Sequence, residues 1–90
     1  MINEKLRQYI KEYNEDAVVF DNPSFDGSII GISTEGHVIY DLCSMIQELS
    51  IDDQMSYEEA SEFIDYNTLR ALPYITEGTK PIILEQIVEC

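Results

Sequence analysis

Apolar side chains recur at helical spacing near the beginning of the chain. Leu6, Tyr9, Ile10 and Tyr13 follow one another at intervals of three, one and three residues, and Ile2 precedes them by about one turn. Side chains at these intervals share one face of an α-helix. The pattern therefore predicts an amphipathic helix that turns this stripe toward a core.

The clearest local pattern predicts a β-hairpin over residues 28–41. Two runs rich in β-branched side chains flank a three-residue loop that ends in Gly36, and such loops favour Gly because it readily adopts positive φ. Pairing Ser33 with His37 then fixes which side chains share a face. One face holds Ile30, Ile32, Val38 and Tyr40, and the other holds Ile29, Gly31 and Ile39.

Two shorter apolar runs predict further strands. Residues 17–20 and residues 82–88 are rich in β-branched side chains, which fit the pleated surface of a sheet. Between the first of these runs and the hairpin, residues 21–24 (DNPS) are typical of a turn. Pro fixes φ there, and Asp and Asn hydrogen-bond their own backbone.

Two more helices are predicted after the hairpin. Asp41 is placed to cap the first, whose buried stripe is Leu42, Met45, Ile46 and Leu49. Ser56 and Glu59 form a capping-box sequence at the start of the second, and Pro73 ends it. The side chains expected inside this second helix are Ala60, Phe63, Ile64 and Leu69.

The order of these elements predicts the fold class. Helix, three strands, two helices and a final strand follow one another without a βαβ repeat. Such an order favours an antiparallel sheet with helices packed on it. We therefore predict a single α+β domain over residues 1–90, with a small antiparallel sheet of three to four strands packed against about three helices and the hairpin at its centre.

Charge changes this picture from a generic small domain to a strongly acidic one. The 90 residues include 18 Asp and Glu but only 5 Lys and Arg, which gives a net charge of −13. Residues 12–69 contain no Lys or Arg at all. Nucleic acid and anionic membranes both require a cationic surface, so neither is expected as a direct partner. A basic protein surface is expected instead, and the absence of a signal-peptide pattern or of a ~20-residue apolar run predicts a cytoplasmic protein.

The acidity is densest over residues 48–65, which we take as the candidate partner-binding surface. Three of its carboxylates, at positions 58, 62 and 65, are spaced for one helix face, where like charges destabilise by a few tenths of a kcal/mol per pair. Two interpretations stay open: a solvated face that serves solubility, and an imitation of the phosphate array of a nucleic acid. The candidate residues are Glu48, Asp52, Asp53, Glu58, Glu59, Glu62 and Asp65.

Signs of catalytic or metal chemistry are weak in the sequence. The only histidine, His37, is expected at a strand end facing solvent, and metal sites need several clustered His or Cys ligands. Cys43 and Cys90 are expected as reduced thiols, with Cys43 packed as a small hydrophobe and Cys90 open to linking two chains in vitro. We therefore predict no catalytic residues, no metal, no cofactor and no enzymatic activity.

Arg70 is the first cation after the long acidic stretch. We expect it to form an ion pair, with Asp65 as the nearest candidate and Tyr66 packed alongside. If that pair is buried, Arg70→Ala should lower stability more than a surface substitution does. The best non-acidic candidates for partner specificity are Asn67, Arg70, Pro73 and Tyr74.

Residues 20–23 (FDNP), which lead into the hairpin, and residues 66–74 (YNTLRALPY), which close a helix, carry a resemblance. Over residues 20–81 the chain resembles small uncharacterised acidic proteins of Gram-positive bacteria and their phages and mobile elements. By type, its size and acidity are similar to those of DNA-mimic inhibitors such as anti-CRISPR or anti-restriction proteins. This predicts a non-enzymatic inhibitor that occupies the basic surface of a nucleic-acid-handling protein. The alternative is a generic interaction module, forming a homodimer through a sheet edge at residues 82–88, whose acidity serves only solubility.

Overall fold

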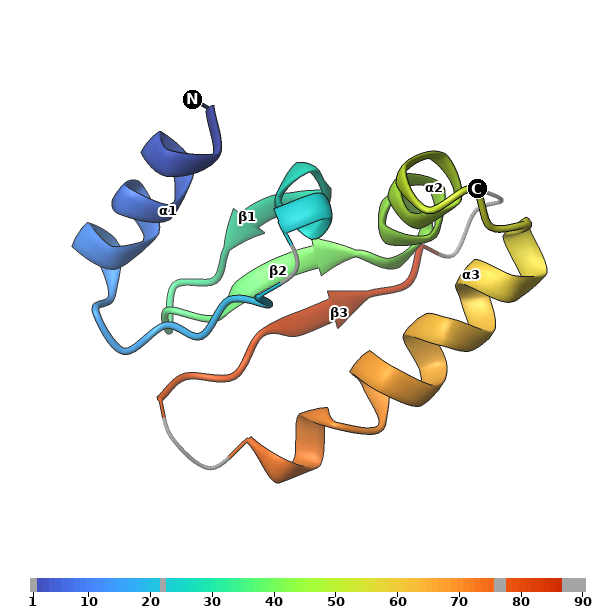
Figure 1. Cartoon of the computed structure of the whole chain (residues 1–90). Helices are drawn as coiled ribbons and strands as arrows, with labels where there is room; N and C mark the ends of the chain where they lie inside the picture. Colours follow the sequence, from blue (N-terminus) through green and yellow to red (C-terminus); the bar gives the residue numbers. More distant parts are fainter. Residues whose placement is uncertain (1, 22, 76–77, 87–90) are drawn as a thin grey trace.

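Over the residues that the structure describes, the protein has an α+β fold with three α-helices and one small sheet (Figure 1). The computed structural model describes residues 2–21, 23–75 and 78–86. The helices are α1 (Ile2–Tyr13), α2 (Leu42–Asp52) and α3 (Tyr57–Ile64). The strands are β1 (Ile29–Ile32), β2 (Val38–Asp41) and β3 (Ile82–Leu84), and the short helical turns are η1 (Pro23–Ser28), η2 (Asp65–Leu69) and η3 (Leu72–Tyr74). The predicted fold class is confirmed.

The sheet is mixed, with strand order β1-β2-β3. β1 and β2 form the predicted antiparallel hairpin, but β3 runs parallel to β2, so the prediction of a purely antiparallel sheet is wrong. A parallel neighbour requires a crossover of a dozen or more residues, and α2 and α3 supply it. The predicted final strand ends at Leu84, and its positions 87–88 lie outside the described residues.

The predicted strand over residues 17–20 does not form. Of these four residues only Ala17 pairs, in an isolated parallel bridge with Thr79. The bridge consists of two main-chain hydrogen bonds, from the Val18 N–H to the Thr79 carbonyl and from the Thr79 N–H to the Asp16 carbonyl. The turn predicted for residues 21–24 is replaced by the 3-10 helix η1, which begins at Pro23. Proline is well suited to a first helical position because its missing N–H has no partner there in any case. The turn's position 22 lies outside the described residues.

The hairpin has the predicted loop but a shifted register. The Ser33 N–H donates to the His37 carbonyl at 2.8 Å, and Gly36 adopts φ +93°. A β-bulge lies between Ile29 and Gly31, however, and leaves Ile30 57% exposed. An extra residue in one strand reverses the alternation beyond it. Ile29 therefore packs against the core in place of Ile30, which corrects the predicted face.

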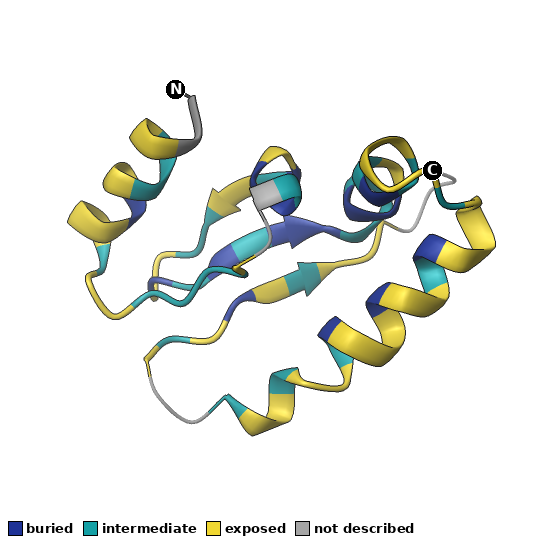
Figure 2. Ribbon diagram, viewed as in Figure 1, coloured by how far each residue is buried: buried dark blue, intermediate teal, exposed yellow. Residues whose placement is uncertain are grey.

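One hydrophobic cluster holds the fold together. The predicted α2 stripe is confirmed, since Met45, Ile46 and Leu49 are buried and Leu42 is half-buried. Among the α1 side chains whose burial the structure describes, only Ile10 is fully buried, because the helix lies beside one edge of the sheet and cannot be covered all along its stripe (Figure 2). The cluster consists of Ile10, Phe25, Val38, Tyr40, Met45, Ile46, Leu49, Ala60 and Ile64.

A buried polar network ties α1 to η1 and β2. The Arg7 guanidinium donates to both carboxylate oxygens of Asp26 at 2.8 Å and to the Phe20 carbonyl at 3.0 Å. The Phe20 N–H in turn donates to the Tyr40 hydroxyl at 3.0 Å. Asp26 raises the pKa of Arg7 mainly through its hydrogen bonds with the guanidinium. Burial raises the pKa of Tyr40.

Two single-residue predictions change in the structure. His37 is half-buried, and its Nδ1 lies 2.8 Å from the Lys80 carbonyl, so it connects the hairpin to the segment before β3 and does not simply face solvent. Cys43 is disulfide-bonded, so the expectation of a reduced thiol is wrong there. Cys90 lies outside the described residues. None of the helices described is long and apolar enough to cross a membrane.

Candidate partner-binding site

The site is built on α3, whose start is fixed by the predicted capping box. The Glu59 N–H donates to the Ser56 hydroxyl at 3.2 Å, and the Ser56 N–H donates back to the Glu59 carboxylate at 3.4 Å. These bonds satisfy two backbone donors that the first turn would otherwise leave without partners. The helix dipole also favours Glu58 and Glu59 at this end.

The C-terminal end of α3 continues as the π-helical turn η2. The Arg70 N–H donates to the Asp65 carbonyl, five residues earlier, at 3.2 Å. A π turn is wider than an α turn and is frequently found at functional sites. Here the turn buries Thr68 and leaves Tyr66 and Asn67 exposed, with the Asn67 amide donating to the Phe63 carbonyl at 3.0 Å.

A shallow hollow of about 390 Å³ lies over α3 and η2, and we call it the α3 hollow. Its apolar and aromatic surface comes from Met55, Phe63 and Tyr66, and the last two are 38% and 66% exposed. Carboxylates from Glu59 and Glu62 stand beside this apolar surface. The complete lining is Met55, Glu59, Glu62, Phe63, Tyr66 and Asn67.

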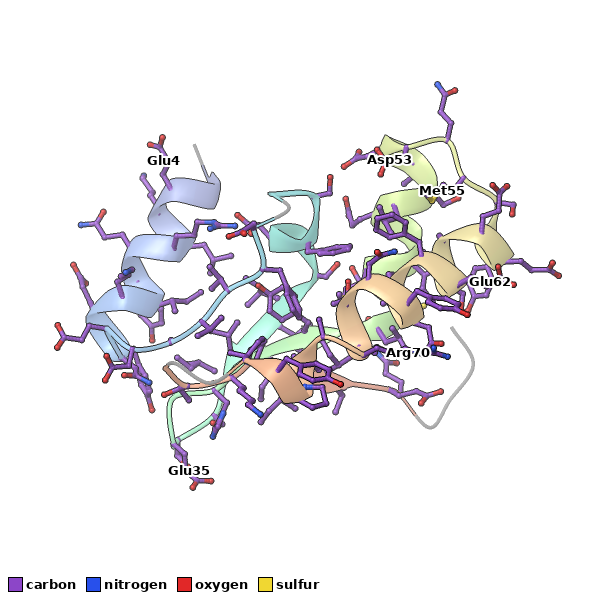
Figure 3. The ribbon with its side chains drawn as sticks, turned by 60° about the horizontal axis from the view of Figure 1, so that its bottom comes forward. Glu4, Glu35, Asp53, Met55, Glu62 and Arg70 are labelled. Carbon is purple, nitrogen blue, oxygen red and sulfur yellow. The ribbon has the colours of Figure 1, made fainter. Side chains whose placement is uncertain are left out.

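The structure brings only part of the predicted acidic surface to this hollow. Glu59 and Glu62 line it, and the exposed side chains of Glu58 and Asp65 lie on the same helical segment. Asp52 and Asp53 are exposed at the end of α2. Figure 3 shows Asp53, Met55 and Glu62 at one end of the molecule, away from Glu4 and Glu35.

Glu48 does not belong to the α3 hollow. It is half-buried on α2, and its carboxylate lies about 3.4 Å from the point where a Cβ on Gly27 would stand. Its side chain therefore faces η1, on a different part of the surface. The spacing of acids along the sequence did not reveal that Glu48 faces a different surface. Glu48 lies on α2, before the loop to α3, and the direction in which α2 turns this side chain depends on how the two helices pack.

Arg70 forms the predicted pair with Asp65, at 3.6 Å, and its guanidinium lies 4.3 Å from the centre of the Tyr66 ring. The two charged side chains are 61% and 55% exposed. The predicted pair therefore forms, but the condition that it is buried is not met, because Asp65 is an exposed residue at the start of η2. An exposed pair of this length contributes little to stability, so Arg70→Ala is no longer expected to destabilise the fold strongly.

Sequence reasoning missed the apolar part of the site. The sequence pattern predicts Phe63 inside the protein, yet more than a third of it is exposed, and no pattern in the sequence marks Met55 as part of a surface. The buried stripe of α3 and η2 is narrow and follows Ala60, Ile64 and Thr68 at intervals of four, so Phe63 lies at its border. A signal was present in the sequence: Phe63 and Tyr66 repeat the spacing of Glu59 and Glu62, four residues further on.

The arrangement can hold a cation. An aromatic face attracts a guanidinium or ammonium, and carboxylates beside it add charge-assisted hydrogen bonds. Arg70 already lies over the Tyr66 ring and forms an ion pair with Asp65 within the chain. Among the residues that the structure describes, no three His, Cys, Asp or Glu side chains converge to hold a metal ion.

Comparisons of the chain with protein-family models, with curated proteins and with solved structures found no match. The geometry of the α3 hollow and the charge around it therefore carry the functional argument by themselves.

Proposed function

We propose that this protein is a non-enzymatic acidic binding protein that occupies a basic surface of a nucleic-acid-handling protein, in the manner of a DNA-mimic inhibitor. The observation that carries the proposal is the α3 hollow: exposed aromatic side chains and carboxylates share one face of a helix that has no Lys or Arg of its own. A basic partner would find both charge and apolar contact area there.

The linear charge density of α3 supports mimicry of a phosphate array. Glu58, Glu59, Glu62 and Asp65 fall within eight consecutive residues. At a rise of 1.5 Å per residue, this gives about one charge per 3 Å of helix axis. One strand of DNA carries about one charge per 3.4 Å. A groove shaped by Lys and Arg for a phosphate backbone therefore meets a similar density of negative charge on α3.

The net charge of −13 acts at longer range. Complementary potentials steer two proteins together and raise the association rate, and salt screens this effect within about 10 Å at 0.1 M. The aromatic surface then adds apolar burial that salt does not screen. Tight binding at low salt that weakens, without vanishing, at high salt is the expected signature.

The test is displacement of labelled duplex DNA from a panel of purified restriction and CRISPR nucleases, measured by fluorescence anisotropy. The double variant Glu58→Lys, Glu62→Lys should lose the displacement. The matched control is Glu4→Lys, Glu12→Lys on α1, which changes the net charge equally and should retain most of it. No displacement from any nuclease, or equal loss in both double variants, would contradict the proposal, because the second result would leave only net charge at work.

The edge of the sheet that β3 forms favours a second candidate function, self-assembly. β3 is an edge strand, and Ile82 and Leu84 on it are 39% and 41% exposed. Exposed apolar edge strands can pair with another chain. Sedimentation at increasing protein concentration tests this: a mass that rises for the wild type but not for Ile82→Lys supports assembly, and a constant monomer mass rejects it.

A further inference from the structure

A second hollow lies on the opposite side of the molecule, between α1 and β1, and has a different character. Its volume is about 280 Å³, and we call it the α1–β1 groove. Figure 1 shows α1 alongside the outer edge of β1. The lining is apolar almost throughout: Leu6, Tyr9 and Ile10 from the helix, and Ile29, Ile30, Gly31 and Ile32 from the strand.

The groove follows the edge of the strand and not one of its faces. Successive side chains of a strand point to opposite faces, yet all four residues of β1 line the hollow. β1 has a strand neighbour on one side only, since the order is β1-β2-β3. The groove is therefore bounded by a helix on one side and by the main chain of an edge strand on the other.

The hairpin register shows which backbone groups face the groove. Ser33 and His37 form a hydrogen-bonded pair, and Ile32 is paired with Val38 next to them. Hydrogen-bonded and non-hydrogen-bonded pairs alternate in an antiparallel ladder. The Ile32 N–H and C=O therefore point away from β2, toward the open edge. A Cβ added to Gly31 would meet nothing within 4 Å, so a second chain can approach the strand closely here.

We propose that the α1–β1 groove binds an extended, cationic peptide segment of a partner protein by adding it as a strand to β1. Main-chain hydrogen bonds to the edge, together with apolar side chains in a pocket at alternate positions, are the general mode of strand addition. Pockets for small molecules usually measure about 300–1,000 Å³. This smaller groove suits one or two apolar side chains of a peptide better than a whole small molecule.

Geometry and charge favour a peptide over a second copy of the chain. α1 already borders the open edge of β1, so a second copy that paired there through its own β1 would also have to fit its own α1 beside that edge. Each copy carries a net charge of −13, so two copies repel one another. The charges on α1 itself cancel, because Lys5 and Lys11 offset Glu4 and Glu12 and Arg7 is paired with Asp26. The attraction for a segment that carries Lys or Arg between its apolar residues therefore comes from the net charge of the rest of the chain. The proposal stands independently of the α3 hollow, which involves other elements.

The test uses a short capped peptide that alternates lysine and valine, titrated into the isotopically labelled full-length protein and followed by NMR. We expect chemical-shift changes at Tyr9 and along Ile29–Ile32. The control peptide has the same sequence with its central amide N-methylated, so that it cannot donate one main-chain hydrogen bond. One such bond contributes about 0.5–1.5 kcal/mol, so the control should bind roughly twofold to thirteenfold more weakly.

Two variants test the edge from the side of the protein. Ile32→Pro removes an N–H that β2 does not use, and proline is accepted on edge strands, so the fold should persist while binding weakens about as much as with the N-methylated peptide. If that variant fails to fold, Ile30→Lys serves instead, because it places a charge at the rim of the groove. Shift changes confined to α3, or equal binding by both peptides, would overturn the proposal. The absence of any binding would also overturn the proposal. The bulge at Ile30 would then be explained as a feature that prevents other chains from pairing with the edge of β1.

Discussion

The same two residue types form an ion pair at each end of the molecule, in opposite surroundings. At the junction of α1 and η1, Arg7 makes two hydrogen bonds of 2.8 Å to Asp26, whose side chain is 1% exposed. Beside the α3 hollow, Arg70 lies 3.6 Å from Asp65, and both side chains are more than half exposed. Burial, more than residue identity, therefore decides what each arginine can do.

The buried pair has a structural role, and the exposed pair leaves its groups accessible. Asp26 has no solvent to compensate for a lost partner, so the fold depends on Arg7. Asp65 and Tyr66 can exchange Arg70 for water or for a cation of another protein at little cost. A surface that binds a partner needs groups of this second kind, and they lie at the acidic end of the molecule.

The largest effect is expected for Arg7→Leu. Removing one member of a buried pair costs about 3–5 kcal/mol, and the lower end applies because the Arg7 side chain is 34% exposed. Urea unfolding monitored by circular dichroism measures the loss. The double variant Arg7→Leu, Asp26→Leu should recover much of it, because no charge is then left buried alone. A loss no larger than that of Arg70→Leu would remove the contrast between the two pairs.

Tyr40→Phe should cost about 1 kcal/mol at neutral pH, because the Phe20 N–H loses its acceptor. The alkaline range sharpens the test. Burial raises the pKa of Tyr40 in the folded state, whereas an unfolded tyrosine ionises near pH ~10. The stabilising contribution is therefore complete below about pH 10 and is lost as pH rises toward the folded pKa. Urea midpoints should fall more steeply with pH in the wild type than in Tyr40→Phe, and the exposed-site control Tyr74→Phe should match the wild type.

Ser56→Ala should destabilise the α3 end by about 1 kcal/mol through loss of the capping box. Ser56→Asp keeps an oxygen acceptor at the cap and should restore most of the stability. Thermal unfolding of the three proteins measures both changes. Equal melting temperatures for the Ala and Asp variants would show that the cap does not hold this end.

The smallest effect is expected for Arg70→Leu, at most about 0.5 kcal/mol, because an exposed pair contributes about 0–1 kcal/mol. The same urea series measures it. A loss of 2 kcal/mol or more, on the scale of about 3 kcal/mol for breaking a buried pair, would mean that Arg70 supports η2 and that the two ends of the molecule are not different in kind.

Local patterns in the sequence predicted the elements that local physics determines. The α2 stripe, the capping box at Ser56 and the hairpin loop at Gly36 all formed as predicted. Each depends on side chains within a few residues of one another. The parallel pairing of β3 depends instead on where two helices return the chain, and no nearby residue specifies it.

The bulge and the π turn limited prediction of the surfaces. The hairpin pattern alone placed Ile30 inward, but one inserted residue turned it outward and opened the α1–β1 groove. The η2 turn similarly placed Tyr66 and Asn67 at the α3 hollow. The sequence showed where along the chain the acidic residues are concentrated. Which of them share a surface depends on packing, as Glu48 shows.

The parallel pairing of β3 has a consequence for the order of folding. β2 meets β1 across a short loop, but it meets β3 only after α2 and α3 have been placed. Closing the longer loop costs more chain entropy, so we expect the hairpin to form early and β3 to dock last. Ile83→Ala should then give a φ-value near zero and Val38→Ala a clearly higher one in stopped-flow refolding. During synthesis, too, the central strand β2 must wait for Ile82–Leu84 to emerge before the sheet is complete.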